Sequence, residues 1–262
     1  MISRRSVVAC AAALPVTLAM PAFAKADQTA PVIAAASDLQ FALEEVAAQF
    51  HAESGQQVQI TYGSTGNFAR QIREGAPYQM FLAADESFVL DLARDGFARD
   101  EGALYAEGRI VVIAPKGAGW SVDSALEGLG AALAAGGITR FAIANPDHAP
   151  YGQRAEEALR HAGLWEAISP RLVLGENVSQ AAQFALSGNA EGGIVAYALA
   201  LSPALAGQGD FALIPADWHR PLLQRMVLMP QAGPVAEAFY AHMNSPAARQ
   251  IMQRYGFALP QG

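Results

Sequence analysis

Polar and small residues recur at four points of the chain where an apolar, strand-like run gives way to a helical pattern. These four junctions are residues 36–38, 63–67, 150–152 and 177–179. The first backbone N–H groups of a helix have no intrahelical partner, and the helix dipole makes that end partly positive. Four such ends that meet at one point would bind an anion without lysine, arginine or a metal ion.

The most specific junction is Gly-Ser-Thr-Gly-Asn at 63–67, because its glycines let the backbone approach a ligand closely. It is neither G-x-G-x-x-G nor a P-loop, since the Gly-Lys pair is missing. Each junction alone also fits an ordinary helix cap. Ser37 and Gln40 have the spacing of a capping box, and Thr65 and Ser179 are common N-cap types. The anion site therefore depends on all four junctions coming together.

The elements that would position these junctions alternate between strands and helices. We predict strands at residues 32–36, 58–62, 80–83, 109–115, 140–144, 171–174, 193–196 and 225–229. We predict helices at residues 39–53, 68–74, 86–94, 154–161, 180–186, 234–243 and 246–255. This alternation is typical of α/β proteins with mostly parallel sheets, in which ligands bind at the carboxyl edge of the strands.

The chain also divides into two blocks. A Gly- and Ala-rich stretch at 116–137 separates them, and each block has the pattern of a strand-helix-strand unit. Two long strands suit crossings between lobes. We predict a first lobe formed by residues 25–112 and 226–262, and a second lobe formed by residues 113–225.

The first 24 residues have the pattern of a secretory signal peptide. Arg4 and Arg5 precede an apolar run, and Ala-Phe-Ala at 22–24 fits a cleavage site. The arginine pair also fits a twin-arginine signal, so the export route stays open. The single cysteine, Cys10, lies in this segment. We therefore predict a periplasmic protein whose mature chain has no disulfide and no thiolate metal site.

Composition excludes several classes of protein. The chain has 262 residues, a net charge of −7, 16% charged and 52% hydrophobic residues. This composition is too apolar for a disordered chain and too acidic for a nucleic-acid-binding protein. The five histidines lack the spacing of a metal site. We place Arg70, Arg73 and Arg154 on solvated helix faces.

Seven segments, which together span nearly the whole mature chain, resemble the periplasmic molybdate-binding proteins of ABC transporters. Among them are AAASDLQFALEEVAAQF, YGSTGNFARQIREGAP and FAIANPDHAPYGQRAEEAL. The segments are residues 34–50, 62–77, 81–98, 109–117, 141–159, 192–200 and 250–260.

This resemblance implies an α/β fold of the type II periplasmic binding protein class, with two lobes, two hinge crossings and mostly parallel sheets. It further implies a monomer that binds molybdate, and tungstate, through hydrogen bonds alone and delivers it to membrane permease subunits. No catalysis and no cofactor are implied, and molybdenum would be held only as its oxyanion.

The resemblance also implies a set of ligand-binding residues. Hydroxyl and N–H groups would come from the first lobe, and backbone N–H groups from the second. Carried over by position, the residues are Ser37, Asp38, Ser64, Thr65, Tyr151 and Val178.

Two positions depart from the family pattern. Asp38 places a carboxylate beside a dianion, so we predict that this side chain faces away from the ligand and caps a helix. Some relatives have a ligand tyrosine where this chain has Ala196, so no site is carried over there.

Two other functions remain open. The first is a binding protein for sulfate or a small organic anion, although an organic ligand calls for a larger apolar pocket. The second is a serine hydrolase in which Ser64, His148 and an aspartate form a triad. Gly-Ser-Thr-Gly is not the G-x-S-x-G nucleophile elbow, which argues against the hydrolase.

Overall fold

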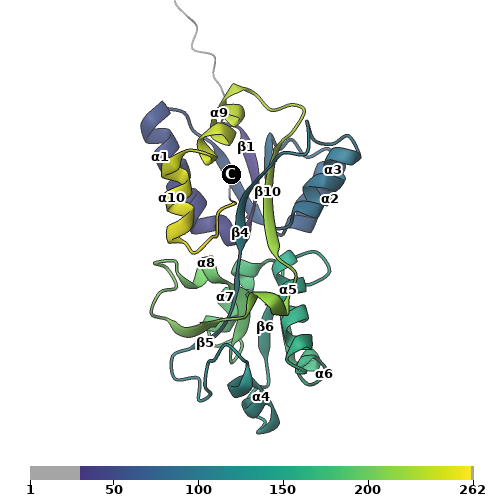
Figure 1. Cartoon of the computed structure of the whole chain (residues 1–262), viewed down its shortest axis with the longest axis vertical. Helices are drawn as coiled ribbons and strands as arrows, with labels where there is room; N and C mark the ends of the chain where they lie inside the picture. Colours follow the sequence, from purple (N-terminus) through teal and green to yellow (C-terminus); the bar gives the residue numbers. More distant parts are fainter. Residues whose placement is uncertain (1–29, 261–262) are drawn as a thin grey trace, which may run out of the picture.

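The structure is a computed structural model that describes residues 30–260. It has two lobes, each built on a five-stranded sheet flanked by helices (Figure 1). The strand order is β2-β1-β3-β10-β4 in the first lobe and β7-β6-β8-β5-β9 in the second. The predicted two-lobed α/β architecture is confirmed. The predicted signal peptide lies outside the described residues.

The first lobe packs helices on both faces of its sheet. Its strands are β1 (Val32–Ala36), β2 (Gln59–Gly63), β3 (Met80–Ala83), β4 (Ala103–Gly108) and β10 (Leu222–Leu228). Its helices are α1 (Gln40–Ser54), α2 (Thr65–Arg73), α3 (Glu86–Arg94), α9 (Pro234–Met243) and α10 (Pro246–Arg254). Successive residues of β1 enter opposite cores: Ile33 packs with α1, α9 and α10, and Ala34 with α2 and α3. Burial on both faces explains why β1 is an unbroken apolar run.

The second lobe repeats this plan. Its strands are β5 (Ile110–Pro115), β6 (Phe141–Ala144), β7 (Leu172–Gly175), β8 (Gly193–Ala196) and β9 (Gly209–Leu213). Its helices are α4 (Glu127–Ala134), α5 (Pro150–His161), α6 (Trp165–Ile168), α7 (Val178–Leu186) and α8 (Tyr197–Ala200). Three 3₁₀ turns complete the described chain: η1 (Ser37–Leu39), η2 (Ser169–Arg171) and η3 (Ala216–Trp218).

Both sheets are mixed, whereas the sequence predicted mostly parallel ones. β1 pairs in parallel with β2 and β3, but β10 runs antiparallel to β3 and β4. In the second lobe β6 pairs in parallel with β7 and β8, and β5 runs antiparallel to β8 and β9. The antiparallel pairings involve the strands next to the crossings between the lobes.

The chain changes lobe at two places. It leaves the first sheet at Arg109, between β4 and β5, and returns through residues 214–221, between β9 and β10. All of β5 pairs within the second sheet and all of β10 within the first, so both changes fall a few residues before the predicted boundaries, 112/113 and 225/226. β4 mixes small and charged residues and was not predicted from the sequence, and β10 begins at Leu222, before the predicted start at residue 225.

Three helices begin earlier than predicted, and each of them starts at a junction. α2 begins at Thr65, α5 at Pro150 and α7 at Val178. Their first turns lack the apolar periodicity by which a helix is recognised in sequence. In α5 this turn packs tightly on the end of β6, because a Cβ atom at Gly152 would lie 2.1 Å from the carbonyl oxygen of Ala144. The candidate site residues therefore belong to the helical turns themselves.

Candidate functional site

The four junctions meet at one small cavity between the lobes. Its volume is about 10 Å³, and η1 and α2 of the first lobe face α5 and α7 of the second across it. All six residues predicted from the resemblance line it: Ser37, Asp38, Ser64, Thr65, Tyr151 and Val178. Every one of these side chains is buried.

Two hydroxyl groups in this cavity keep their own hydrogen free. The Oγ1 atom of Thr65 accepts a hydrogen bond from the backbone N–H of Ala84 at 3.0 Å. The Oγ atom of Ser37 accepts one from the N–H of Ser179 at 3.3 Å. Because a hydroxyl can accept and donate at once, each O–H remains available to a ligand.

Backbone N–H groups add to these donors. Thr65, Tyr151 and Val178 lie in the first turns of α2, α5 and α7, where an N–H group has no partner within its own helix. In the described part of the chain, no other backbone group accepts from these three N–H groups. The helix dipoles add partial positive charge at the same point.

Ser64 links the two lobes directly. Its Oγ atom lies 2.8 Å from the Nδ1 atom of His148, and the N–H of the neighbouring Gly66 donates to the carbonyl oxygen of His148 at 2.9 Å. The Nε2 atom of His148 lies 3.7 Å from a carboxylate oxygen of Glu176, a partner that the triad hypothesis did not name. These contacts hold the Gly-Ser-Thr-Gly turn against the second lobe.

The capping-box prediction for Ser37 is wrong. The residue before η1 is Ala36, and no side chain caps this turn. Ser37 instead bonds to the second lobe, because its carbonyl oxygen accepts from the hydroxyl of Ser179 at 2.8 Å, in addition to the Oγ contact. The side chain of Ser37 therefore serves the contact between the lobes and not a helix cap.

The prediction that Asp38 caps a helix is also wrong. Its side chain is 1% exposed, and its Oδ2 atom accepts hydrogen bonds from the amide of Gln224 at 2.6 Å and from the hydroxyl of Tyr151 at 3.0 Å. Burial raises the pKa of Asp38 to about 6, although both hydrogen bonds act to lower it. Sequence reasoning missed Gln224; its only signal is one amide within the apolar strand β10.

Arg154 was predicted to lie on a solvated face, but it is 2% exposed. Its guanidinium pairs with Asp85, the N-cap residue just before α3 in the first lobe, and with Glu157 at 3.3 Å. A buried charge needs a partner, and here Asp85 of the opposite lobe supplies one. The ion pair between Arg154 and Asp85 is thus a contact between the lobes.

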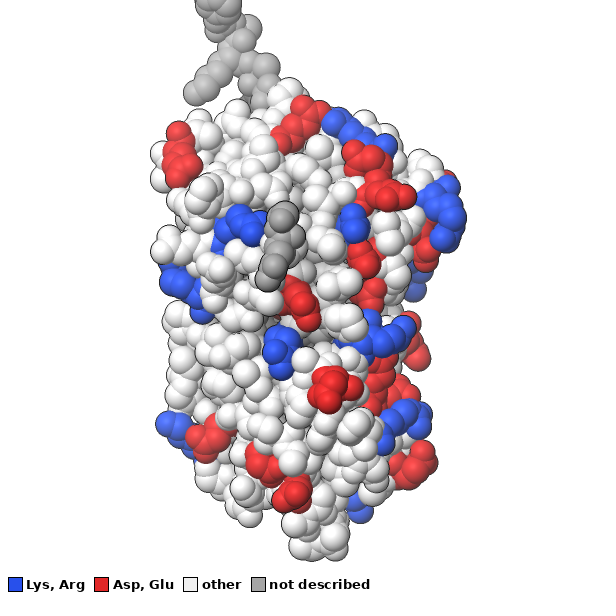
Figure 2. All heavy atoms as spheres, viewed as in Figure 1, with Lys and Arg blue, Asp and Glu red and all other residues white. Residues whose placement is uncertain are grey.

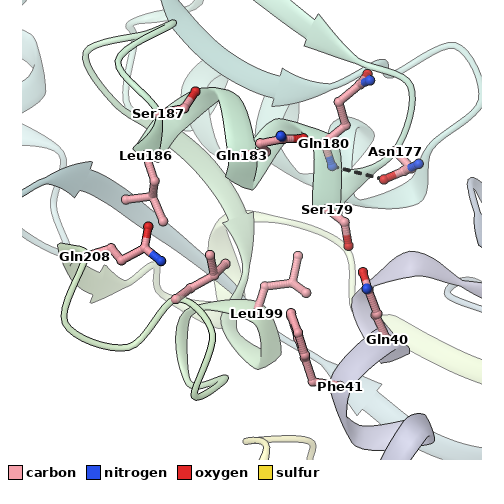
Figure 3. A pocket seen from close by; sticks show the side chains of 11 residues that line it. Gln40, Phe41, Asn177, Ser179, Gln180, Gln183, Leu186, Ser187, Leu199 and Gln208 are labelled. Atoms are coloured by element: carbon pink, nitrogen blue, oxygen red, sulfur yellow. Dashed lines mark hydrogen bonds between the residues drawn. The ribbon is translucent and has the colours of Figure 1, made fainter.

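A larger cavity, with a volume of about 420 Å³ (Figure 3), shares Asn177 with the small one. Glutamine amides and apolar side chains line it, including Gln40 and Phe41 of α1 and Gln180 and Leu199 of the second lobe. It contains none of the hydroxyl groups of Ser37, Ser64 and Thr65. The free donors described above therefore belong to the smaller cavity.

The small cavity has no cation in its lining, and Asp38 is the single charged residue there among those described. Figure 2 shows acidic and basic side chains intermixed over one face of the molecule. Residues 30–260 contain no group of three or more side chains placed to hold a metal ion. Within the same range, no helix is long and apolar enough to cross a bilayer.

Comparison with known proteins shows the family. The profile described as "Bacterial extracellular solute-binding protein" matches residues 31–258. The chain is 33% identical to the molybdate-binding protein ModA of Azotobacter vinelandii, over 94% of this chain and 97% of that one. It is 34% identical to ModA of Rhodobacter capsulatus, over 95% of this chain and 94% of that one.

Solved structures agree with the sequence comparison. The structure of the A. vinelandii periplasmic molybdate-binding protein has a TM-score of 0.78, and the match covers 88% of this chain and 100% of that chain at 33% identity. Two lobes, interlobe donors and the match along nearly the full length lead to one conclusion: this chain belongs to the family of bacterial extracellular solute-binding proteins.

Proposed function

We propose that this protein captures molybdate, and tungstate, outside the cytoplasm and delivers it to the permease of an ABC importer. One observation carries the proposal: the free hydroxyl and N–H donors of four helix-starting turns, two from each lobe, line a single cavity without lysine or arginine. The names of the relatives at 33% and 34% identity support molybdate as the ligand.

The donors suit a small tetrahedral dianion. Hydrogen bonds to a charged group contribute about 1.5–3 kcal/mol each, so about six of them outweigh the cost of association. Remote acidic side chains matter little, because the Debye length at physiological salt is about 8 Å. An anion that carries a hydrogen, such as hydrogen phosphate, would leave that hydrogen without an acceptor, at a cost of about 1–3 kcal/mol.

Binding closes the lobes because the donors are divided between them. Ser37 and Thr65 lie in the first lobe, and Tyr151 and Val178 in the second. An anion that contacts both sets binds the closed form better than the open one and shifts the population toward it. This differential contact is the mechanism of capture.

A thermal-shift screen with molybdate, tungstate, sulfate and phosphate tests the proposal. At a concentration of 100 Kd, a true ligand adds about 2.7 kcal/mol to the free energy of unfolding. We expect molybdate and tungstate to stabilise the protein at lower concentrations than the other two anions. Stabilisation by sulfate alone would assign the protein to another ligand of the same fold.

The contact between Ser64 and His148 makes a hydrolase the second candidate function, because acyl transfer needs a nucleophile next to a base. The pair forms across the two lobes, and Ser64 is only 4% exposed when it forms. We expect no hydrolysis of a simple aryl ester above background. Hydrolysis that disappears in Ser64→Ala would establish the second function.

Export and oligomeric state complete the proposal. We propose cleavage after Ala24 and a monomeric mature protein in the periplasm. Mass spectrometry of the mature N-terminus and light scattering of the purified protein would check the two statements separately. An intact N-terminus in the periplasmic fraction would contradict the first, and a stable dimer would contradict the second.

A further inference from the structure

Asp38 belongs to a buried cluster of four polar side chains where the two lobes meet. Asp38 lies in η1, Tyr105 in β4, Tyr151 in α5 and Gln224 in β10. The exposed fraction of each is 3% or less. Three of the four come from the first lobe and Tyr151 from the second, so the cluster is complete only when the lobes are together.

Each hydrogen bond to Asp38 in this cluster has a defined donor. The hydroxyl of Tyr105 donates to Oε1 of Gln224 at 2.8 Å, which turns the amide nitrogen of Gln224 toward Asp38. The same nitrogen lies 3.1 Å from the Tyr151 hydroxyl oxygen, and that hydroxyl donates to Oδ2 of Asp38. Oδ2 therefore receives two donors, whereas Oδ1 is buried and has no hydrogen-bond partner. Oδ1 is the oxygen left for a proton.

The basic side chains on the packed elements face other groups. Arg154 of α5 pairs with Asp85, and Arg225 of β10 pairs with Glu86 at 2.8 Å. Neither arginine forms an ion pair with Asp38. The carboxylate is therefore held by neutral donors alone.

Among the residues described, the other ionisable groups around η1 form no ion pair with Asp38 either. Burial and the charge of Asp38 raise the pKa of Tyr105 and of Tyr151 well above the ordinary value, so both stay neutral. Burial and Glu44 raise the pKa of Tyr62 in β2. The other ionisable side chains on the packed elements β4, α1, α5 and α8 are Glu107, Glu45, His51, Glu53, Glu156, Glu157, Arg160, His161 and Tyr197. α7 has no ionisable side chain.

We propose that Asp38 takes up one proton from solvent, on Oδ1, when the oxyanion binds, so that the bound dianion faces a neutral carboxyl group. The inference rests on the proposed function. One O–H bond forms on Asp38, solvent loses the proton, and no other bond changes. Burial has already raised the pKa of this group to about 6, and a dianion in the same cavity raises it further.

Protonation also bears on the selectivity of the site. Asp38 lines the cavity, so an ionised carboxylate there repels a dianion, whereas a neutral carboxyl group does not. This state suits a fully deprotonated oxyanion such as molybdate.

Calorimetric titration with molybdate between pH 6.5 and 8 tests the inference, in two buffers that differ in heat of ionisation. We compare the wild type with Asp38→Asn, and use Asp91→Asn as the matched control because Asp91 lies on the exposed face of α3. For wild type and Asp91→Asn we expect uptake of close to one proton at the upper end of the range. By linkage, their Kd rises up to about tenfold per pH unit. For Asp38→Asn we expect no uptake and a flat Kd.

The possible outcomes distinguish a failure of the inference about Asp38 from a failure of the proposed function. Molybdate binding by the wild type with no proton uptake and a flat Kd overturns the inference and leaves the proposed function intact. If neither molybdate nor tungstate binds at any pH, the proposed function fails, and the inference with it. A wild type that binds molybdate without taking up a proton overturns the inference even if Asp38→Asn does not fold.

Discussion

The hydroxyl groups at the cavity accept one hydrogen bond and keep their own hydrogen free. Thr65 accepts from the N–H of Ala84, which leaves its O–H available to a ligand. We predict that Thr65→Ala raises the Kd for molybdate by about tenfold to a hundredfold, which corresponds to one charge-assisted hydrogen bond. Thr65→Ser keeps the hydroxyl and is the control in the same calorimetric titration. Equal Kd values for the two variants would show that the Thr65 hydroxyl does not bind the ligand.

The buried carboxyl of Asp38 makes stability depend on pH. Burial raises its pKa in the folded protein to about 6, against an ordinary value of 3.8. Between these values the folded state binds more protons than the unfolded state, so stability falls as pH rises from about 4 to 6. The cost of ionised Asp38 at neutral pH is on the order of 3 kcal/mol.

We therefore predict that Asp38→Asn without ligand unfolds at a higher temperature than the wild type at pH 7.5. The advantage shrinks as pH falls toward 4, because the wild-type carboxyl is then neutral as well. Thermal unfolding of both proteins at several pH values measures this difference. An advantage that stays constant with pH would mean that Asp38 titrates normally.

At the scale of elements, the sequence predicts well what periodicity encodes. The predicted bounds of β1, β3, β8, α3 and α9 agree with the structure, because these segments are continuous apolar runs or helices with a clear apolar face. The starts of α2, α5 and α7 were placed too late. Their first turns are built for the site, with Thr65-Gly66 and Tyr151-Gly152 in place of apolar residues.

Gly66 illustrates this conflict between helix and site. A Cβ atom there would lie 2.6 Å from the carbonyl oxygen of His148 in the opposite lobe. Alanine favours a helix over glycine by about 0.5–1 kcal/mol, so the first lobe should tolerate it. The clash arises only when the lobes meet.

We predict that Gly66→Ala weakens molybdate binding at least tenfold and leaves the melting temperature without ligand within a few degrees of the wild type. Gly130→Ala in α4 is the control, because its nearest neighbour is the flexible side chain of Leu164 at 3.3 Å. Titration and thermal unfolding of both variants give the comparison. A Gly66→Ala protein that binds like the wild type would show that the lobes need not approach this closely.

At the scale of the whole molecule, contacts between the lobes set the balance of open and closed forms. Arg154 in the second lobe pairs with Asp85 in the first, and both are largely buried. Opening the lobes separates them. We predict that Arg154→Met raises the Kd for molybdate at least tenfold, because Asp85 then stays unpaired in the closed form.

Arg160→Met on the same helix is the matched control, since Arg160 is exposed and pairs with Glu156 at 2.8 Å within the second lobe. It should bind molybdate like the wild type. Stopped-flow measurements should assign the loss in Arg154→Met mainly to faster ligand release. Equal release rates in the two variants would exclude Arg154 as a link that favours closure.

The sequence alone predicts the two lobes and the cavity residues, but not what joins the lobes. The six residues that the resemblance implies all lie among those that line the cavity. The partners of Asp38 could not be found in this way, because Gln224 lies 186 residues away in the chain. Such pairs are set by how two separate sheets come together, and local sequence patterns carry no information about that.

We propose that neutral donors from both lobes hold the oxyanion without a cation. A crystal structure of the protein grown with tungstate tests it most directly, since the anomalous signal of tungsten locates the anion. We expect one strong peak between Ser37, Thr65, Tyr151 and Val178, with no lysine or arginine nitrogen within hydrogen-bond distance. A peak at another place, or one held by an arginine, would contradict it.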